Sequence, residues 1–350
     1  MLKESAGLEE ELKARALRLG FSLFGIASPG PAESYERYIR WLDEGKHGGM
    51  AYLDSAYHRQ TRSDPALLYP GLQSIIVLGY PYHLTSESAA GGEWVGRISG
   101  YAACEDYHSR LPDLLKPLCD MLVNAFPESP QPRVFTDSAP ILERELAVRA
   151  GLGWIGRNSC VISPREGSGF LLTEIFTAMP LRTNPPYPED HCGSCTRCLD
   201  ACPTGCIQED RTIDAARCIS YLTIENKGEI LAGQGGKVGE WVFGCDLCQT
   251  VCPWNRKVLT RVDDGQTLSG FSVEKMLRVL RFTKDDFDHR FSSSAIKRAK
   301  LNGLKRNILV WMGNHRMREA VEIIEEILQT EEDPMVSTTA RDVLKQLADI

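Results

Sequence analysis

Nine of the twelve cysteines fall in one segment, residues 192–252, and eight of these nine have the spacing of cluster ligands. The first four form the run Cys-x-x-Cys-x-x-Cys-x-x-x-Cys-Pro, which bacterial two-cluster ferredoxins use; they are Cys192, Cys195, Cys198 and Cys202. Three closely spaced cysteines wrap a loop around one cubane, whereas the fourth lies too far along the chain to close the same cluster and ligates the other. The run therefore predicts iron–sulfur chemistry, with electrons moved one at a time.

The second half of the segment, Cys245-x-x-Cys248-x-x-x-Cys252-Pro253, holds three of the four ligands that a second run would need. Cys218 supplies the missing one, so residues 219–244 form an insertion between ligands of one cluster. Two [4Fe-4S] clusters with crossed ligation are expected. The first would be held by Cys192, Cys195, Cys198 and Cys252, and the second by Cys202, Cys218, Cys245 and Cys248.

Zinc is the alternative metal, because Cys-x-x-Cys pairs also form tetrahedral zinc sites. Zinc does not account for a third cysteine at the same interval or for the Cys-Pro endings, so we favour the iron–sulfur interpretation. Four cysteines remain outside the scheme, and we interpret them as small apolar packing residues. These are Cys104, Cys119, Cys160 and Cys206.

The bulk composition fits a cytoplasmic, multidomain protein. A chain of 350 residues is long enough for two or three cores. Its apolar runs are far shorter than the roughly 18 residues of a membrane span, and the N-terminus has no signal-peptide pattern. The net charge of -7 argues against uniform coating of nucleic acid and leaves room for a local basic patch.

The chain divides into three expected regions, residues 1–180, 181–260 and 261–350. In the first, helical spacing of apolar residues ends at Gly20, a buried strand is expected at 75–80, and extended chain at 169–178. The first region is therefore of α/β or α+β character. Four prolines in residues 180–188 mark a linker before the cysteine-rich region. Beyond Trp254 the apolar spacing predicts two or three short antiparallel helices.

Residues 151–156, Gly-Leu-Gly-Trp-Ile-Gly, match the dinucleotide-binding pattern letter for letter. That fingerprint must follow a strand and open a helix. Here the preceding residues 141–148 are themselves predicted to be helical. The glycines are therefore expected to end a helix and form a turn, and nicotinamide binding is disfavoured.

Asp137 has two interpretations on sequence alone. It precedes the helix expected from Ile141, so Asp137 or Ser138 is most simply an N-cap. The alternative is a proton donor beside the redox centre, which requires that burial or charge raise the pKa of the carboxyl group from about 3.9 toward neutrality. Asp106-Tyr107-His108 also offers titratable groups, although a lone histidine is more often structural than catalytic.

Motifs along nearly the whole chain resemble those of one known family. They are TRSDP at 61–65, YA at 101–102, DYH at 106–108, Asp137, RAGLGWIGRN at 149–158, CGSC at 192–195, CPTG at 202–205, RCISYLTIE at 217–225 and GCDLCQ at 244–249. In combination they resemble the cobalamin-dependent epoxyqueuosine reductases. This family completes the queuosine modification in the anticodon loop of certain tRNAs.

The resemblance implies a fold and a chemistry. It implies a nitroreductase-like α/β (α+β) cobalamin-binding domain, a ferredoxin-like two-cluster module and a small HEAT-like helical region at the C-terminus. Base-off cobalamin would be reduced through the two clusters to cob(I)alamin, with electrons from an external donor such as flavodoxin or ferredoxin. Asp137 matches the family's proton donor, which protonates the oxygen leaving the opened epoxide, and this reverses the preference for the cap.

The resemblance also assigns contacts to cobalamin. Besides Asp137, the matching positions are Arg62, Ser99, Asn158, Val161, Leu172, Ser220 and Lys227. Some members carry a cysteine facing the cobalt where this chain has Ser99, so a thiol is not essential at that position. Some relatives also end in longer helical repeats, which bears on the extent of the tRNA footprint.

Two other functions compete with this one. A reductive dehalogenase also pairs a corrinoid with two clusters, but its exported members carry a twin-arginine signal that is not found here. A non-catalytic electron-transfer protein would need only the cysteine-rich region. It would leave the long first region without a purpose.

A basic segment is the candidate surface for tRNA. Five cations fall within ten residues: Lys297, Arg298, Lys300, Lys305 and Arg306. The aliphatic residues Leu301, Leu304 and Ile308 are expected to pack inward and leave the charges in solvent. An ordinary solvated helix face is the alternative. The family resemblance favours contacts with phosphates of the anticodon loop.

Overall fold

The computed structural model describes residues 2–84, 95–230, 233–259 and 270–348. The first region is built on a four-stranded sheet in the order β1-β2-β7-β4, in which every neighbouring pair is antiparallel. The strands are β1 (Leu23–Ala27), β2 (Ser74–Pro81), β4 (Arg133–Phe135) and β7 (Phe170–Thr177). The expected strand at 75–80 and the extended segment at 169–178 are confirmed, and the antiparallel pairing makes the region α+β.

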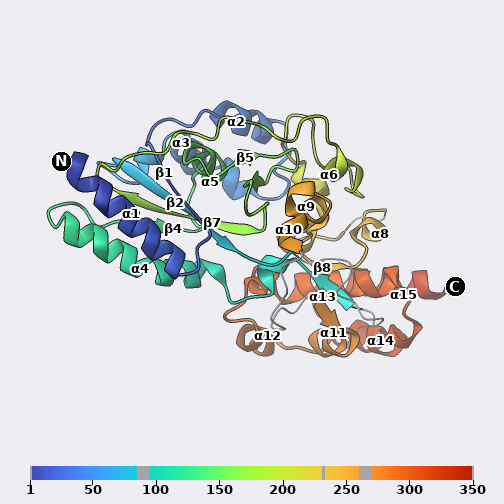
Figure 1. The fold of residues 1–350 in the computed structure, drawn as a ribbon. Helices are drawn as coiled ribbons and strands as arrows, with labels where there is room; N and C mark the ends of the chain where they lie inside the picture. The colour runs from blue at the N-terminus through green and yellow to red at the C-terminus, as the bar shows by residue number, and fades with distance from the viewer. Residues whose placement is uncertain (1, 85–94, 231–232, 260–269, 349–350) are drawn as a thin grey trace.

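Helices cover both faces of this sheet (Figure 1). Helices α1 (Leu2–Arg18) and α4 (Tyr107–Ala125) pack against each other and lie on one face, and α5 (Glu143–Arg149) packs on the other. Because side chains alternate along a strand, Ile175 of β7 enters one core and Phe176 the other. Two further helices of this region are α2 (Tyr35–Asp43) and α3 (Ala56–Ser63).

A second sheet, ordered β8-β3-β9, joins the three expected regions. Strand β3 (Val95–Ile98) comes from the first region, β8 (Trp241–Phe243) from the cysteine-rich region and β9 (Gly270–Ser272) from the C-terminal region. Strand β3 pairs in parallel with β8 and antiparallel with β9. The three regions therefore share one sheet and its core, and the domain boundaries at 180 and 260 stay a prediction.

The cysteine-rich region is made of short helices joined by turns. They are α6 (Arg197–Asp200), α7 (Ile219–Ile224), α8 (Gly235–Val238), α9 (Leu247–Thr250) and α10 (Arg256–Leu259). Helices α6 and α9 pack together, which brings the two cysteine runs side by side. A two-stranded hairpin of β5 (Trp154–Ile155) and β6 (Val161–Ile162) lies upstream in the sequence.

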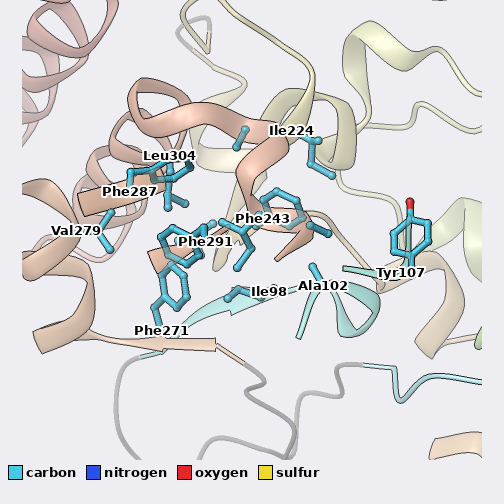
Figure 2. Packing of buried hydrophobic residues seen from close by; sticks show 14 of the residues in the cluster. Ile98, Ala102, Tyr107, Ile224, Phe243, Phe271, Val279, Phe287, Phe291 and Leu304 are labelled. Atoms are coloured by element: carbon cyan, nitrogen blue, oxygen red, sulfur yellow. The ribbon is translucent and has the colours of Figure 1, made fainter. Parts of the chain in front are cut away.

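The C-terminal region is more helical than expected. Residues 270–348 form α11 (Val273–Leu280), α12 (Lys284–Arg290), α13 (Lys300–Asn314), α14 (Val321–Thr330) and α15 (Pro334–Ala348). Helix α13 packs on α15 and on β8. Figure 2 shows the core beneath the second sheet, where Phe271, Phe287 and Phe291 gather with Leu304, and Tyr107 lies at one side. The predicted inward packing of Leu304 and Ile308 is confirmed.

Several local expectations can be compared with the backbone. Helix α1 ends just before Gly20, which has φ of +94°, a left-handed conformation that favours glycine at a helix end. Helix α5 is likewise followed by Gly151, with φ of +76°, so the glycine-rich run ends a helix as predicted. None of the helices formed by the described residues is long and apolar enough to cross a membrane.

Candidate active site

By the expected assignment, the eight ligand cysteines form a first group of Cys192, Cys195, Cys198 and Cys252 and a second group of Cys202, Cys218, Cys245 and Cys248. In the first, burial raises the pKa of Cys198, and the neighbouring thiols of Cys192 and Cys252 raise it further. Cys252 in turn is affected by Cys192 and Cys195. A cysteine from the second run thus lies among the first three cysteines of the other run, which is the arrangement that crossed ligation requires.

The second group contains the remaining expected ligands. The pKa of Cys245 is raised to about 12, first by burial and then in part by Asp246 and the thiol of Cys202. Burial raises the pKa of Cys248, and the nearby thiols of Cys245 and Cys198 are among the groups that raise it further. Because Cys245 and Cys198 belong to different groups, the two groups are adjacent. These proximities are consistent with crossed ligation, and the assignment of four thiols to each cluster stays a prediction.

Cys206 lies beside the expected cluster ligands and is therefore more than an apolar packing residue. It is buried, as expected, but its Sγ lies 3.5 Å from Sγ of Cys202, and the thiol of Cys218 is near enough to affect its pKa. It therefore contacts one expected ligand of the second group and lies near another. Sequence reasoning missed this contact, because Cys206 follows the Cys-Pro turn outside the cysteine spacing.

Aromatic rings enclose one side of the first group. Trp154, Tyr187, His191 and Trp254 lie in mutual contact, with Trp154 and Trp254 edge to face at 5.0 Å between ring centroids. The indole Nε1–H of Trp154 donates to Sγ of Cys192 at 3.4 Å. Trp154 belongs to the glycine-rich run at 151–156, which thus places an aromatic ring and a hydrogen-bond donor beside an expected ligand thiol.

Ser99 and Asn158 adjoin the second group. Oγ of Ser99 donates to Oδ1 of the fully buried Asp246 at 2.5 Å, and Asp246 follows Cys245 in the chain. Nδ2 of Asn158 donates to the carbonyl oxygen of Cys248 at 3.2 Å. Both side chains are 2% exposed and are used within the protein. Their surroundings link the first region to the second thiol group.

Asp137 lies in a strained turn rather than at a helix cap. Its φ is +49°, and α5 begins only at Glu143, with Leu142 at its N-cap and no side-chain cap. The capping interpretation is therefore wrong. The backbone N–H of Asp137 donates to Oε1 of Glu143 at 2.8 Å, and the hydroxyl of Tyr107 donates to Oδ2 of Asp137 at 2.9 Å. The side chain is 64% exposed, so a substrate can reach its carboxylate.

His108 lies between two carboxylates. Its Nδ1 is 2.7 Å from Oδ1 of Asp106, and its Nε2 is 3.8 Å from Oδ2 of Asp137. These carboxylates, Asp137 first, raise the pKa of His108 although burial opposes them. Burial alone would raise the pKa of Asp137, but the nearby His108 ring and the hydrogen bond from Tyr107 lower it. The raised pKa that we expected of a proton donor is therefore not found on Asp137 itself. The proton shared by the pair is therefore held mainly on His108.

Two further glutamates face this site. Glu174 of β7 is fully buried, and neither carboxylate oxygen has a hydrogen-bond partner among the described residues. Burial, followed by the nearby Glu143 and Asp137, raises its pKa well above the usual value. Burial and Asp137 also raise the pKa of Glu143 to about 8. Sequence reasoning missed both, although a glutamate inside the apolar strand at 170–177 was a signal.

The acid site and the second thiol group converge around Tyr101. Burial raises the pKa of its hydroxyl, and the carboxylates of Asp137, Asp246 and Glu225 raise it further. Asp137 comes from the first region, whereas Asp246 and Glu225 come from the cysteine-rich region. The pKa of Tyr52, likewise raised first by burial, also reflects Glu225, Arg298 and Asp137. The site thus lies where all three regions meet.

The positions matched to cobalamin differ in how their side chains are used. Arg62 is partly exposed, with its guanidinium 5.2 Å from the centre of the Tyr38 ring. Val161 and Leu172 belong to the apolar cluster on the α5 face, and Ser220 is partly exposed on α7. Nζ of Lys227 is bonded to the carbonyl oxygens of Ile224 and Arg298. This set combines polar and apolar side chains, a chemistry that fits an amide-rich macrocycle, and Lys227 fits least because its ammonium group is already hydrogen-bonded within the protein.

The basic segment is not the uniform solvated face that we expected. Lys305 and Arg306 are 8% and 0% exposed, so the expectation of solvent exposure is wrong for these two. Arg306 instead donates to the carbonyl oxygens of Leu222, Asn226 and Gly228 and fastens α13 to the cysteine-rich region. Helical spacing indicated only one buried face and did not reveal a neighbour on the other.

The remaining three cations are exposed but not equivalent. Nζ of Lys297 is 2.6 Å from Oδ2 of Asp106. Arg298 makes a two-pronged contact with Glu225, at 2.6 and 3.1 Å. Lys300 has no ion-pair partner in the part of the chain that the structure describes. Binding of tRNA by these residues stays a prediction.

Paired thiol groups beside a titratable acid define the class of protein, an iron–sulfur oxidoreductase. Residues 191–255 match the family model described as a 4Fe-4S double cluster binding domain, which confirms the two clusters. Residues 62–138 match the model described as "Epoxyqueuosine reductase QueG, DUF1730". The chain is 41% identical to the epoxyqueuosine reductase of Cyclobacterium marinum, over 85% of this chain and 94% of that protein. It belongs to the epoxyqueuosine reductase family.

Other relatives agree along the length of the chain. The epoxyqueuosine reductase of Escherichia coli is 37% identical, with 90% of this chain and 83% of that protein covered. The solved structure of the Streptococcus thermophilus enzyme matches with a TM-score of 0.87 at 28% identity, over 97% of this chain and 90% of that one. An epoxyqueuosine reductase bound to an epoxyqueuosine-modified tRNA-Tyr stem loop matches with a TM-score of 0.88 at 26% identity, over 98% and 91%.

Proposed function

We propose that this chain reduces epoxyqueuosine to queuosine at the wobble position of the tRNA anticodon, the final step of queuosine biosynthesis. The observation that carries the proposal is Asp137, an accessible carboxyl group held by Tyr107 and His108 beside the second thiol group. A related structure from Bacillus subtilis is described as having its catalytic aspartate loop swung out of the active site. That description supports a catalytic role for the strained Asp137 turn.

Electrons would enter at the first cluster and leave from the second. Cys195 in the first group is exposed, whereas the expected ligands of the second group are only partly exposed. Electron hopping needs the adjacency that Cys198 and Cys248 show. Flavodoxin or ferredoxin is the class of donor that we propose for the exposed end.

Cobalamin is the cofactor that we propose between the second cluster and the substrate. When bound, it would supply the reducing metal centre. The residues that would hold it are Arg62 and Ser220 through polar groups, Val161 and Leu172 through apolar contact, and Ser99 and Asn158 from beside the second thiol group. Lys227 is the least suited, because its ammonium group is already bonded within the protein.

The proton is the contribution of this chain's own side chains. Removal of the epoxide oxygen as water, with formation of the ring alkene, consumes two electrons and two protons. Asp137 would give a proton from its carboxyl group to the oxygen as the carbon–oxygen bond breaks. Tyr107 holds the acid, and His108 returns a proton to it.

The experiment is a comparison of the protein with Asp137→Asn, both purified without oxygen and assayed on tRNA that carries epoxyqueuosine. An amide keeps the hydrogen bond from Tyr107 but cannot give up a proton. Turnover should therefore fall about 10²–10⁴-fold, the usual contribution of a general acid. Iron and cobalamin contents should not change. Near-normal conversion by Asp137→Asn would refute the assignment of the acid.

The broader setting follows from this activity. An enzyme that acts on tRNA works in the compartment that holds tRNA, so we place it in the cytoplasm. We propose tRNA as the macromolecular partner, contacted by the exposed cations Arg298 and Lys300, because Lys297 is paired with the buried Asp106. The same proposal covers the three regions. Residues 1–180 would be nitroreductase-like, residues 181–260 ferredoxin-like and residues 261–350 HEAT-like.

A further inference from the structure

A continuous line of polar contacts runs from the C-terminal region to the catalytic acid. Lys297, in the 3-10 helix Ala295–Ala299, lies 2.6 Å from Oδ2 of Asp106. The other oxygen of Asp106 lies 2.7 Å from Nδ1 of His108, and Nε2 of His108 faces Oδ2 of Asp137 at 3.8 Å. The four groups come from three segments that are far apart in the sequence.

Asp106 is the buried centre of this line. Its side chain is 1% exposed, whereas Lys297 is 52% exposed and His108 is 41% exposed. A buried carboxylate is costly unless it is paired. Asp106 is therefore bonded on both oxygens, and it also accepts the backbone N–H of His108 as the cap of α4. The backbone N–H of Asp106 donates to Ser293, which ties this turn to the segment that carries Lys297.

We propose that Lys297 is a positioning residue for the proposed reaction. It holds Asp106, and Asp106 in turn orients the His108 ring so that His108 can supply a proton to Asp137. This inference rests on the proposed role of Asp137. The proton moves from Nε2 of His108 to the carboxylate of Asp137, and from there to the oxygen released from the epoxide. The gap of 3.8 Å closes by a small rotation of the exposed Asp137 side chain or through one water.

The charge of Lys297 sets how firmly His108 holds its proton. An imidazole between two full carboxylates would bind the proton too tightly to pass it on. The ammonium group of Lys297 neutralises one carboxylate and thereby weakens that hold. The other titratable groups near Asp137 are Glu143, Glu174 and Arg144. The Tyr107 ring stacks on the ring of His108, with the two ring centroids 4.0 Å apart.

The test compares Lys297→Met, which removes the charge and keeps the length, with Lys297→Arg, which keeps the charge. The first readout is the NMR titration of the His108 ring in the full-length protein. In Lys297→Met its pKa should rise by about half a unit, as expected for loss of a unit charge roughly 7 Å away at high dielectric. Lys297→Arg should titrate like the unmodified protein.

The second readout is the pH profile of turnover on tRNA that carries epoxyqueuosine. Protonated His108 is the active form, so activity is lost as pH rises through its pKa. In Lys297→Met that alkaline limb should move to higher pH, and turnover at neutral pH should fall roughly threefold, the equivalent of half a pKa unit. The salt dependence of tRNA binding should be unchanged.

The matched control is Lys284→Met, which breaks an exposed lysine–aspartate pair with Asp288 that is unconnected to His108. It should change neither readout. An unaltered His108 titration in Lys297→Met would overturn the inference, as would weaker tRNA binding with a reduced salt slope, which would make Lys297 a phosphate ligand. Asp137→Asn separates the two levels: if it stays active, the proposed acid is wrong whatever Lys297 does.

Discussion

The two halves of the site use different kinds of contact to handle electrons and protons. The electron side consists of thiols at fixed intervals on short helices and turns, from Cys192 to Cys252. The proton side consists of side chains from four separate segments, joined by hydrogen bonds around Asp137. Loss of a thiol removes a cluster ligand, whereas loss of one polar group changes the charges and hydrogen bonds that the remaining polar groups experience.

The two halves also differ in how they treat buried charge. Each buried thiol is expected to find compensation in a cluster, which takes the thiolate form. On the proton side Asp106 is compensated by Lys297 and His108, but the carboxylate of Glu174 has no hydrogen-bond partner among the residues that the structure describes. The proton side therefore stores a cost in the folded state that depends on pH. The predictions below test this contrast, beginning with the largest effect.

Cys218→Ser should remove the second cluster. Cys218 lies apart from both cysteine runs, and the proposed assignment makes it the fourth ligand of the second cluster. The variant, reconstituted without oxygen, should bind about four irons instead of about eight. Iron analysis with electron paramagnetic resonance of the reduced protein measures the loss.

Cys206→Ser is the control for that prediction. Its Sγ lies 3.5 Å from that of Cys202 and near the thiol of Cys218, but it is not an expected ligand. Both clusters should persist in this variant. If the two variants lose equal amounts of iron, the assignment of ligands to the second cluster is incorrect.

Glu174→Gln should make the protein more stable at alkaline pH. The folded-state pKa of Glu174 is raised, so above the unfolded value of about 4.3 the unfolded state ionises while the folded state does not. The free energy of unfolding therefore falls as pH rises through this window. Glutamine removes that penalty, so the variant should be more stable than the unmodified protein at pH 8 and no more stable at pH 4. Urea unfolding at both pH values measures it.

Glu145→Gln is the matched control, because this buried glutamate of α5 is fully engaged. Its carboxylate accepts the backbone N–H of Glu33 at 2.8 Å and pairs with Arg149 at 2.7 Å. The change should destabilise the protein by about 1–3 kcal/mol, the usual cost of removing one partner of a buried bond. If Glu174→Gln shows the same loss at pH 8, Glu174 is charged and paired in the folded protein.

The electron side could be predicted from the sequence because its geometry is local. A cubane needs thiols at set intervals, so the spacing from Cys192 to Cys202 states both the metal and its number of ligands. The strands at 74–81 and 170–177 were equally accessible, since apolar runs between turn residues indicate buried strands. The second sheet was not, because β3, β8 and β9 are short and pair across long separations.

The proton side could not be assembled from the sequence because every contact in it is tertiary. Nothing in the spacing of Asp106 and Lys297 indicates that they form a pair across 191 positions. Family resemblance supplied Asp137, but local rules favoured a helix cap that does not exist. The predicted solvent exposure of Arg306 was wrong for the same reason. Arg306 is buried against the cysteine-rich region, and the spacing of residues in its own helix gives no sign of that contact.

Trp154→Phe should lower the reduction potential of the first cluster alone. The indole N–H donates to Sγ of Cys192, and such a bond favours the more negative, reduced cluster. A hydrogen bond of about 1 kcal/mol corresponds to roughly 40 mV for a one-electron couple. Redox titration followed by electron paramagnetic resonance measures both clusters in one sample. An equal shift in the second cluster would mean that the ring acts through packing instead.

The smallest effect concerns the cations that remain for tRNA once the proton side has used Lys297. Arg298→Ala with Lys300→Ala should reduce the slope of log affinity against log salt by about 1.4, because each phosphate contact on a single strand contributes about 0.7. The control removes exposed cations on other helices, Lys116 of α4, Arg278 of α11 and Lys345 of α15. Three charges lost there should leave the slope nearly unchanged, although the net charge falls further than in the test variant. Equal slopes for both variants would show that tRNA responds to overall charge, so the segment around Arg298 would then serve the proton side and not the RNA.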